Sequence, residues 1–302
     1  MQQTVLILGG NGKVGRHAVD AFWNAGWTVR SYKRGTDMVA AAEGVDVIVN
    51  GLNPPNYHNW GQIIPQITTE VIAAAKASGA TVIIPGNIYN YGNKPGLLDE
   101  DTPQVPNTRK GKIRVAMEQE YKSSGVRTIV LRAGNFIDPY CDDDLMKAAL
   151  LRDIGKDKLT TLGDPDAIQA YAYMPDWARA ALALAEKRWD LPTFSDIPFP
   201  GHSFTTTHLR ALIANHTQRD VRIVGFPWWM MKLLSPFWEL AREMGEMRYL
   251  YDMPHQIGDR TFRRLLPDFV PTDLETVMLS GLPDDIDPNK MMRSGGQVIP
   301  AE

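Results

Sequence analysis

The stretch Val5-Leu6-Ile7-Leu8-Gly9-Gly10-Asn11-Gly12-Lys13-Val14-Gly15 decides the fold of this chain. Its apolar half predicts a buried strand over 3–8, and the amphipathic residues that follow predict a helix over 14–25. Glycines between two such elements permit a tight turn, close approach of the backbone to a pyrophosphate, and close packing of helix on strand. The helix N-terminus then faces the bound anion. We therefore predict a dinucleotide-binding loop rather than a turn with only a structural role.

The residues of this loop that are expected to contact the dinucleotide are Gly9, Asn11, Gly12, Lys13, Val14 and Gly15. An ATP-type phosphate loop is disfavoured, because Val14 stands where a Ser or Thr would ligate magnesium. The next strand ends in Lys33 and Arg34. An acidic residue there suits the ribose 2′-hydroxyl of NAD, whereas a cation suits a 2′-phosphate. Lys33 and Arg34 therefore indicate NADP(H) in preference to NAD(H), unless they are simply solvated surface charges.

The segments after the loop continue the alternation of short apolar runs with amphipathic stretches. Further strands are predicted over 28–32, 46–50, 81–85 and 128–132, and further helices over 61–78 and 108–123. This alternation is typical of a parallel sheet with helices on both faces. We predict an α/β fold with a Rossmann-type doubly wound parallel sheet and a smaller, mainly C-terminal lobe. Because only about a dozen residues separate the strands at 28–32 and 46–50, one strand of the usual sheet is expected to be missing.

Composition excludes several classes of protein. The 302 residues carry a net charge of −3, which gives no electrostatic basis for binding nucleic acid. The single Cys141 cannot form an internal disulfide, and no leader-like segment is apparent, so a cytoplasmic location is expected. No run of about 18 apolar residues suggests a membrane span. The six histidines show no metal-ligand pairing, so no bound metal is expected, and Asp142, Asp143 and Asp144 are read as a helix cap.

Later motifs carry a family resemblance through their order along the chain. They are Asn50-Gly51-Leu52, Ile84-Pro85-Gly86-Asn87-Ile88-Tyr89-Asn90-Tyr91-Gly92, Leu131-Arg132-Ala133-Gly134-Asn135-Phe136 and Tyr171-Ala172-Tyr173-Met174-Pro175-Asp176. Over about residues 3–280 the chain resembles the extended and atypical branches of the short-chain dehydrogenase/reductase superfamily. The resemblance implies further cofactor contacts from Asn50, Gly51, Leu52, Pro85, Gly86, Asn87, Lys110, Gly134, Asn135 and Phe136.

The catalytic set of that superfamily is a Ser or Thr after the fourth strand and a Tyr-x-x-x-Lys on the next helix. In this chain the three positions fall on Asn87, Lys110 and Arg114. The segment from Lys110 to Glu118 also resembles isoflavone-reductase-like enzymes, which implies that Lys110 handles the proton; a desolvated lysine is chemically suited to this. Asn87 would donate a hydrogen bond to the substrate oxygen. The alternatives are that Tyr89 or Tyr91 supplies the proton, or that Lys110 lies on an exposed helix face without a catalytic role.

These inferences give a functional expectation with two alternatives. Residues 1–194 are expected to form the NAD(P)-binding domain, 195–282 a lobe that binds the substrate or a partner, and 283–302 a weakly ordered tail. The expected activity is NADP(H)-dependent oxidation or reduction of a small carbonyl, enone or alcohol. The alternatives are a non-catalytic NAD(P)-sensing or scaffold protein, and a nucleotide-sugar epimerase or dehydratase whose basic cluster would be Arg260, Arg263 and Arg264.

The Trp- and Met-rich segment 226–247 has no assigned role in these expectations. Its plainest interpretation is a helix that packs within the C-terminal lobe. A homodimer face, a wall of the substrate pocket and a membrane-surface helix are the other interpretations.

Overall fold

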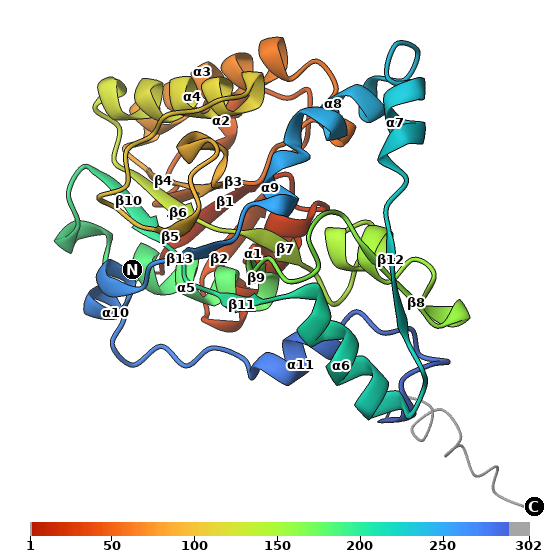
Figure 1. Ribbon diagram of the computed structural model, residues 1–302. Helices are drawn as coiled ribbons and strands as arrows, with labels where there is room; N and C mark the ends of the chain where they lie inside the picture. The colour runs from red at the N-terminus through yellow and green to blue at the C-terminus, as the bar shows by residue number, and fades with distance from the viewer. Residues whose placement is uncertain (1, 290–302) are drawn as a thin grey trace, which may run out of the picture.

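A parallel sheet of six strands forms the centre of the computed structural model, which describes residues 2–289. Its strands are β1 (Thr4–Leu8), β2 (Thr28–Ser31), β3 (Val47–Asn50), β4 (Thr81–Gly86), β6 (Thr128–Arg132) and β10 (Phe194–Pro198), in the spatial order β10-β6-β4-β3-β1-β2 (Figure 1). All neighbours run parallel. The strand order reverses at β1, because β2 lies on one side of it and β3 on the other. Doubly wound sheets bind ligands at such a reversal, outside the carboxyl ends of the strands.

Helices cover both faces of the sheet, which confirms the predicted α/β class. One face carries α2 (Met38–Ala41), α3 (Trp60–Ser78) and α4 (Arg109–Ser124), and the other carries α1 (Lys13–Asn24) and α5 (Met174–Glu186) (Figure 1). Each face has its own apolar core. Successive side chains of a strand point to opposite faces of the sheet, so alternate residues of the same strand pack against the helices of one face or the other. The predicted helices at 14–25, 61–78 and 108–123 correspond to α1, α3 and α4. As expected, the sheet lacks a strand beyond β2, because only the four-residue α2 lies between β2 and β3.

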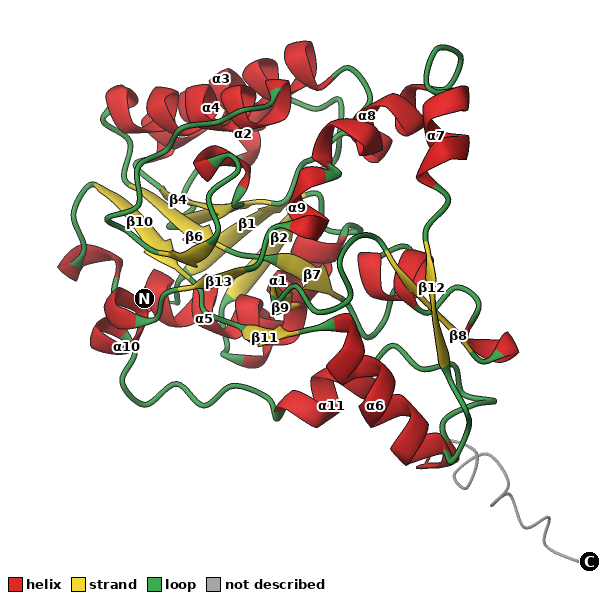
Figure 2. Ribbon diagram, viewed as in Figure 1, coloured by secondary structure: helices red, strands yellow, loops and turns green. Residues whose placement is uncertain are grey.

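The smaller lobe consists of short paired strands and helices (Figure 2). Its strands are β7 (Asn135–Ile137), β9 (Gln169–Tyr173) and β11 (His202–Phe204) in one sheet, β8 (Lys158–Thr161) with β12 (Arg222–Gly225), and β5 (Gly96–Leu98) with β13 (His255–Ile257). Its α-helices are α6 (Thr206–Thr217), α7 (Trp228–Leu234), α8 (Glu239–Met247), α9 (Tyr249–Asp252), α10 (Arg260–Leu265) and α11 (Leu274–Leu279). The chain also has the 3₁₀-helices η1 (Pro55–Tyr57), η2 (Tyr89–Tyr91), η4 (Ile154–Lys156) and η5 (Arg188–Asp190), and the π-helix η3 (Met146–Leu150).

The ends of the predicted domains can be placed on this architecture. The boundary expected at 194/195 falls at the start of β10, which pairs with β6 in the large sheet. Of the predicted tail, residues 283–289 are described, and Ile286 and Asp287 in it are buried. The rest of the predicted tail, 290–302, lies outside the described residues. No helix among residues 2–289 is long and apolar enough to cross a membrane.

Candidate functional site

The glycine loop between β1 and α1 has the geometry of a phosphate cradle. Gly9 has a φ of 77°, and its carbonyl accepts a hydrogen bond from the Gly12 N–H at 2.9 Å. A Cβ on Gly15 would lie 2.1 Å from the Gly9 carbonyl oxygen, so only glycine permits α1 to pack this close to the loop. No side chain caps the N-terminus of α1. Its first N–H groups can therefore bind an anion.

The turn after β3 packs directly against this loop. Gly51 donates from its N–H to the Leu8 carbonyl at 2.9 Å, and a Cβ on Gly51 would lie 3.2 Å from the Gly15 nitrogen. The side chain of Asn50 is buried; its Oδ1 accepts from the Leu52 N–H at 3.1 Å and its Nδ2 donates to Tyr121 Oη at 3.3 Å. Asn50 and Gly51 thus shape the turn, and Leu52 is the first residue of it to line open space.

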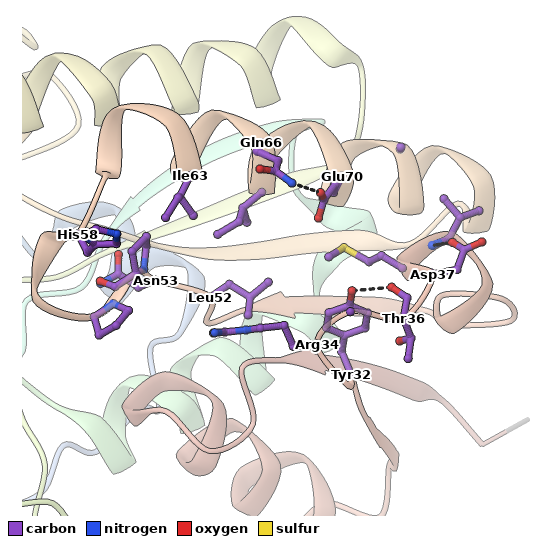
Figure 3. Close-up of a pocket in the computed structure, with 17 residues that line it drawn as sticks. Tyr32, Arg34, Thr36, Asp37, Leu52, Asn53, His58, Ile63, Gln66 and Glu70 are labelled. Atoms are coloured by element: carbon purple, nitrogen blue, oxygen red, sulfur yellow. Dashed lines mark hydrogen bonds between the residues drawn. The ribbon is translucent and has the colours of Figure 1, made fainter.

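A cavity of about 750 Å³ opens beside the turn, at the carboxyl ends of β2 and β3 and against α3. Its lining includes Tyr32, Arg34, Leu52, Asn53, Ile63 and Ile67 (Figure 3). None of residues 9–15 lines this cavity. Gly10 of the glycine loop is close to the end of β2, since a Cβ on it would lie 3.4 Å from Ser31 Oγ, next to the lining residue Tyr32. Figure 3 shows the Arg34 side chain extended along the floor of the cavity beneath Leu52. Lys33 is exposed and does not line the cavity, which leaves Arg34 as the cation available to a ligand there.

Residues 138–147 fold over the N-terminal half of α1. Lys13 Nζ donates to the Asp143 carbonyl at 2.8 Å and lies 3.2 Å from its carboxylate. His17 and Asp138 form a fully buried hydrogen-bonded pair at 2.9 Å. The Asp144 carboxylate accepts from the Lys147 N–H at 2.7 Å, which agrees with the predicted cap. Lys13 therefore faces this segment, beside the glycine loop. Within the described chain no group of three or more His, Cys, Asp or Glu is placed to hold a metal.

The end of β4 brings Asn87 next to two arginines. Arg114 donates to the Pro85 carbonyl, and Arg132 donates to the Asn87 carbonyl at 2.6 Å. Asn87 Oδ1 accepts from the Tyr89 N–H at 3.0 Å. A Cβ on Gly86 would lie 2.7 Å from Val130, so β4 and β6 touch closely here. The side-chain NH₂ of Asn87 is the donor that this turn does not use.

Tyr89 and Tyr91 follow on η2 and have different surroundings. Tyr89 Oη lies 3.3 Å from Tyr57 Oη, and its backbone carbonyl packs against Gly111 so closely that a Cβ there would lie 2.5 Å away. Burial raises the pKa of Tyr89, while its bond to Tyr57 and the charge of Arg114 act to lower it. Tyr91 Oη instead donates to the Asp99 carbonyl at 3.3 Å. Only Tyr89 therefore has a second phenol as its partner.

Lys110 is fully buried at the first turn of α4, so its interpretation as part of an exposed helix face is wrong. Its Nζ lies 2.5 Å from Glu243 Oε2, 2.7 Å from Glu246 Oε2 and 2.9 Å from the Glu243 carbonyl oxygen, all on α8. It also lies 4.8 Å from the centre of the Tyr57 ring. The ammonium thus holds α8 of the smaller lobe onto α4.

A second charge network, centred on the buried Arg132, lies beside the site and was not predicted from the sequence. Arg132 lies 2.7 Å from Glu118 and 2.6 Å from Asp196, which joins β6, α4 and β10. Burial acts to lower the pKa of Arg132, but the carboxylates of the buried Glu118 and the half-buried Asp196 hold it well above its usual value. The signal that could have indicated the network is an arginine directly after the apolar run 129–131.

The remaining predicted residues lie away from the cavity. A Cβ on Gly134 would lie 2.2 Å from the Ala170 carbonyl oxygen, so Gly134 is pressed against β9. Asn135 and Phe136 are half-buried on β7, which pairs with β9. Arg260 and Arg263, proposed for a nucleotide-sugar cleft, are exposed on α10 and form ion pairs with Glu100 and Asp259.

Comparison of the sequence with protein-family models and with curated proteins gives no match. Solved structures do match. MoeE5 in complex with UDP-glucose and NAD aligns over 97% of this chain and 100% of its own, at 15% identity and a TM-score of 0.73. UDP-glucuronic acid 4-epimerase from Bacillus cereus, in complex with UDP-glucuronic acid and NAD, aligns over 97% of this chain and 100% of its own, at 14% identity and a TM-score of 0.73. TunA, an NAD-dependent NDP-hexosamine 5,6-dehydratase, aligns over 97% of this chain and 98% of its own, at 14% identity and a TM-score of 0.70.

At these identities the match establishes the fold. The chain has the fold of NAD-dependent epimerases and dehydratases, which confirms the predicted resemblance to the extended short-chain dehydrogenase/reductases at the level of architecture. The narrower likeness to isoflavone-reductase-like enzymes has no support among these structures. Two of these structures are complexes with NAD, so they do not support the expected preference for NADP(H).

Proposed function

We propose, for a chain with the fold of the extended short-chain dehydrogenase/reductases, that it binds NADP(H) along the carboxyl edge of its sheet and catalyses redox chemistry on a small organic substrate. The observation that supports the proposal is the proximity of the glycine loop to the end of β2, the strand that leads directly into the cavity that Arg34 lines. The loop offers uncapped N–H groups to a pyrophosphate, and the cavity begins where an adenosine ribose would follow.

Arg34 supports the preference for NADP(H). Its guanidinium lies on the cavity floor, and no salt bridge to Arg34 occurs among residues 2–289. A guanidinium can bind a phosphate through two parallel hydrogen bonds, which makes it well suited to the 2′-phosphate. Lys33 has no such position, so we assign the preference to Arg34 alone.

A bound nicotinamide dinucleotide supplies hydride transfer, and the chain must supply the proton and hold the substrate oxygen. The position of the usual catalytic tyrosine is Lys110, whose ammonium is engaged by Glu243 and Glu246. We assign the proton instead to Tyr89, which lies beside the Arg114 charge and bonds to Tyr57. A phenol is protonated at neutral pH at its ordinary pKa of about 10. Burial raises the pKa of Tyr89 further, which weakens it as an acid, while the Tyr57 bond and the Arg114 charge act in the opposite direction. The free NH₂ of Asn87 is placed to donate to the substrate oxygen.

The burial of Lys110 favours a second candidate function. If α8 stays on α4, the region where the usual tyrosine would act is covered, and the chain would bind the dinucleotide without turnover as a sensor or scaffold. A nucleotide-sugar epimerase or dehydratase has the support of the shared fold. Of its proposed cations, Arg260 is engaged with Glu100 and Arg263 with Asp259, whereas Arg264 is exposed and no salt bridge to it occurs among residues 2–289.

One experiment separates these functions. Purified protein is first titrated with NADPH and with NAD+. NADPH oxidation is then followed with a panel of carbonyl and enone compounds, and UDP-sugars incubated with NAD+ are analysed by chromatography, because epimerisation and dehydration consume no cofactor. We expect binding of NADPH and its oxidation by at least one carbonyl or enone. Binding of a dinucleotide without turnover of any compound would favour the sensor, conversion of a UDP-sugar would favour the epimerase or dehydratase, and absence of binding of either dinucleotide would contradict all three.

A further inference from the structure

An exposed apolar patch lies on α7 and the link to α8. We define the patch by Trp229, Met230, Leu233, Phe237 and Trp238. The exposed fraction is 72% for Trp229, 69% for Leu233 and 93% for Phe237. Other large exposed apolar side chains of the described chain are spread along it from Trp23 to Val270, whereas these five fall within ten residues. A cluster of this kind marks an interaction surface, while single exposed apolar residues do not.

The patch is held out from the body by its inward-facing neighbours. Trp228 packs on Phe226 at 4.8 Å between ring centres, and its Nε1 donates to the Leu162 carbonyl at 2.6 Å. Met231, one turn later, is buried. Because residues four apart share a helix face, Trp229 and Leu233 point outward together. Figure 1 shows α7 at a corner of the molecule, far from the central sheet. The patch is therefore a fixed, projecting surface.

The cations without an ion-pair partner beside the patch are Lys232 and Arg248. Both are exposed, no salt bridge to either occurs among residues 2–289, and Arg248 lies 5.6 Å from the centre of the Trp228 ring. Arg242 is also exposed, but it pairs with Glu239 at 3.8 Å and with Glu243 at 3.6 Å. The carboxylates of Glu239 and Glu243 are thus engaged, whereas Lys232 and Arg248 remain as unpaired cations near the aromatic side chains.

We propose that this patch docks the protein onto the surface of an anionic phospholipid membrane, with α7 lying in the plane of the interface. Tryptophan and phenylalanine suit the boundary between headgroups and acyl chains, and cations at the rim attract anionic headgroups. The patch requires no membrane-spanning helix for this. A two-fold contact between two copies fits less well, because Lys232 of both copies would meet with no free carboxylate to pair them.

The test uses the full chain and vesicles of two compositions, phosphatidylcholine alone and phosphatidylcholine mixed with phosphatidylglycerol. We expect the wild type to sediment with the mixed vesicles more than with the neutral ones. The double substitution Trp229→Ser with Phe237→Ser should weaken that binding by roughly tenfold or more. The matched control is Trp23→Ser with Trp189→Ser, which removes two tryptophans that are each 67% exposed elsewhere. Thermal unfolding checks that each variant is folded.

A charge variant keeps the test independent of the apolar side chains. Lys232→Glu should reduce the preference for phosphatidylglycerol and leave the residual binding to neutral vesicles unchanged. The proposal is overturned if the wild type sediments with neither vesicle, or if the patch and control variants bind alike. It is also overturned if the wild type fails to bind vesicles and is a dimer in solution that Trp229→Ser with Phe237→Ser converts to monomer, because the patch would then join two copies.

Discussion

The buried Lys110 of α4 forms an ion pair with the partly exposed Glu246 of α8, with Nζ 2.7 Å from Oε2. The backbone N–H of Lys110 donates to the other oxygen of the same carboxylate at 2.9 Å. Glu243 approaches the ammonium from the preceding turn of α8. Lys110, the residue expected at the position of the catalytic phenol of the resembled superfamily, therefore joins the two lobes of this chain.

Replacing Lys110 with methionine should destabilise the protein strongly. The substitution takes the ammonium from Glu243, which keeps Arg109 at 2.8 Å, and from Glu246, which is 21% exposed. The loss should therefore approach, but stay below, the about 3–5 kcal/mol of a buried charge left without any partner. Chemical denaturation measures the loss. The control is Lys112→Met on the exposed side of the same helix, which should change stability by about 0.5 kcal/mol or less. Equal effects of the two substitutions would contradict the structural role of Lys110.

The same ion pair should make stability depend on pH in the acid range. Burial acts to raise the pKa of Glu243, but its bonds to Lys110 and Arg109 hold it below the ordinary 4.5. The stabilisation is therefore complete above about pH 4.5 and is lost as the pH falls through the lower, folded-state pKa. The difference in unfolding free energy between wild type and Lys110→Met should shrink as the solution is acidified below this value. A difference that grows on acidification would contradict the assignment.

Gly15→Ala should disrupt the phosphate cradle. The new methyl group would lie 2.1 Å from the Gly9 carbonyl oxygen, and backbone must move to admit it. Overpacking of this kind costs about 1–3 kcal/mol, and the moved loop should lose NADPH binding. Thermal unfolding measures the loss of stability, and titration with NADPH followed by intrinsic tryptophan fluorescence measures the loss of binding. Gly245→Ala, at a helical position with open space around it, should retain both stability and binding; unaltered binding by Gly15→Ala would refute the cradle.

Tyr89→Phe should lower turnover by about 10²–10⁴-fold if Tyr89 transfers the proton. Binding of NADPH should remain, since the hydroxyl is not part of the phosphate loop or the Arg34 cavity. Steady-state kinetics with the best substrate of the panel gives the result. Tyr91→Phe removes a hydroxyl that bonds only to the Asp99 carbonyl and should leave turnover nearly intact. If Tyr91→Phe were the more damaging change, the assignment of the two tyrosines would be reversed.

Local patterns made the fold predictable. The strands and helices follow from periodicity over a few residues, and the glycine loop follows from backbone requirements within one turn. The doubly wound arrangement agrees with the prediction, because parallel strands joined by helices have few possible connections. The edge strand β10 was not predicted. The short connection after β2 correctly indicated a missing strand.

The charge networks could not be predicted in the same way, because they join residues far apart in the sequence. Lys110 and Glu243 are separated by 133 positions, and Arg132 and Asp196 by 64. The helical spacing of 109–118 gave no indication that Lys110 would be covered by α8. For the same reason Lys33 and Arg34 looked equivalent in the sequence, although the cavity admits only Arg34.

We propose that Arg34 selects NADP(H) in the cavity beside the glycine loop. Calorimetric titration of wild type, Arg34→Ala and Lys33→Ala with NADPH and with NADH tests it directly. We predict tighter binding of NADPH than of NADH to the wild type. Arg34→Ala should weaken NADPH binding by roughly 10–100-fold, the value of a charge-assisted hydrogen bond, without changing NADH binding, while Lys33→Ala should leave both unchanged. Tighter binding of NADH than of NADPH to the wild type would contradict the claim.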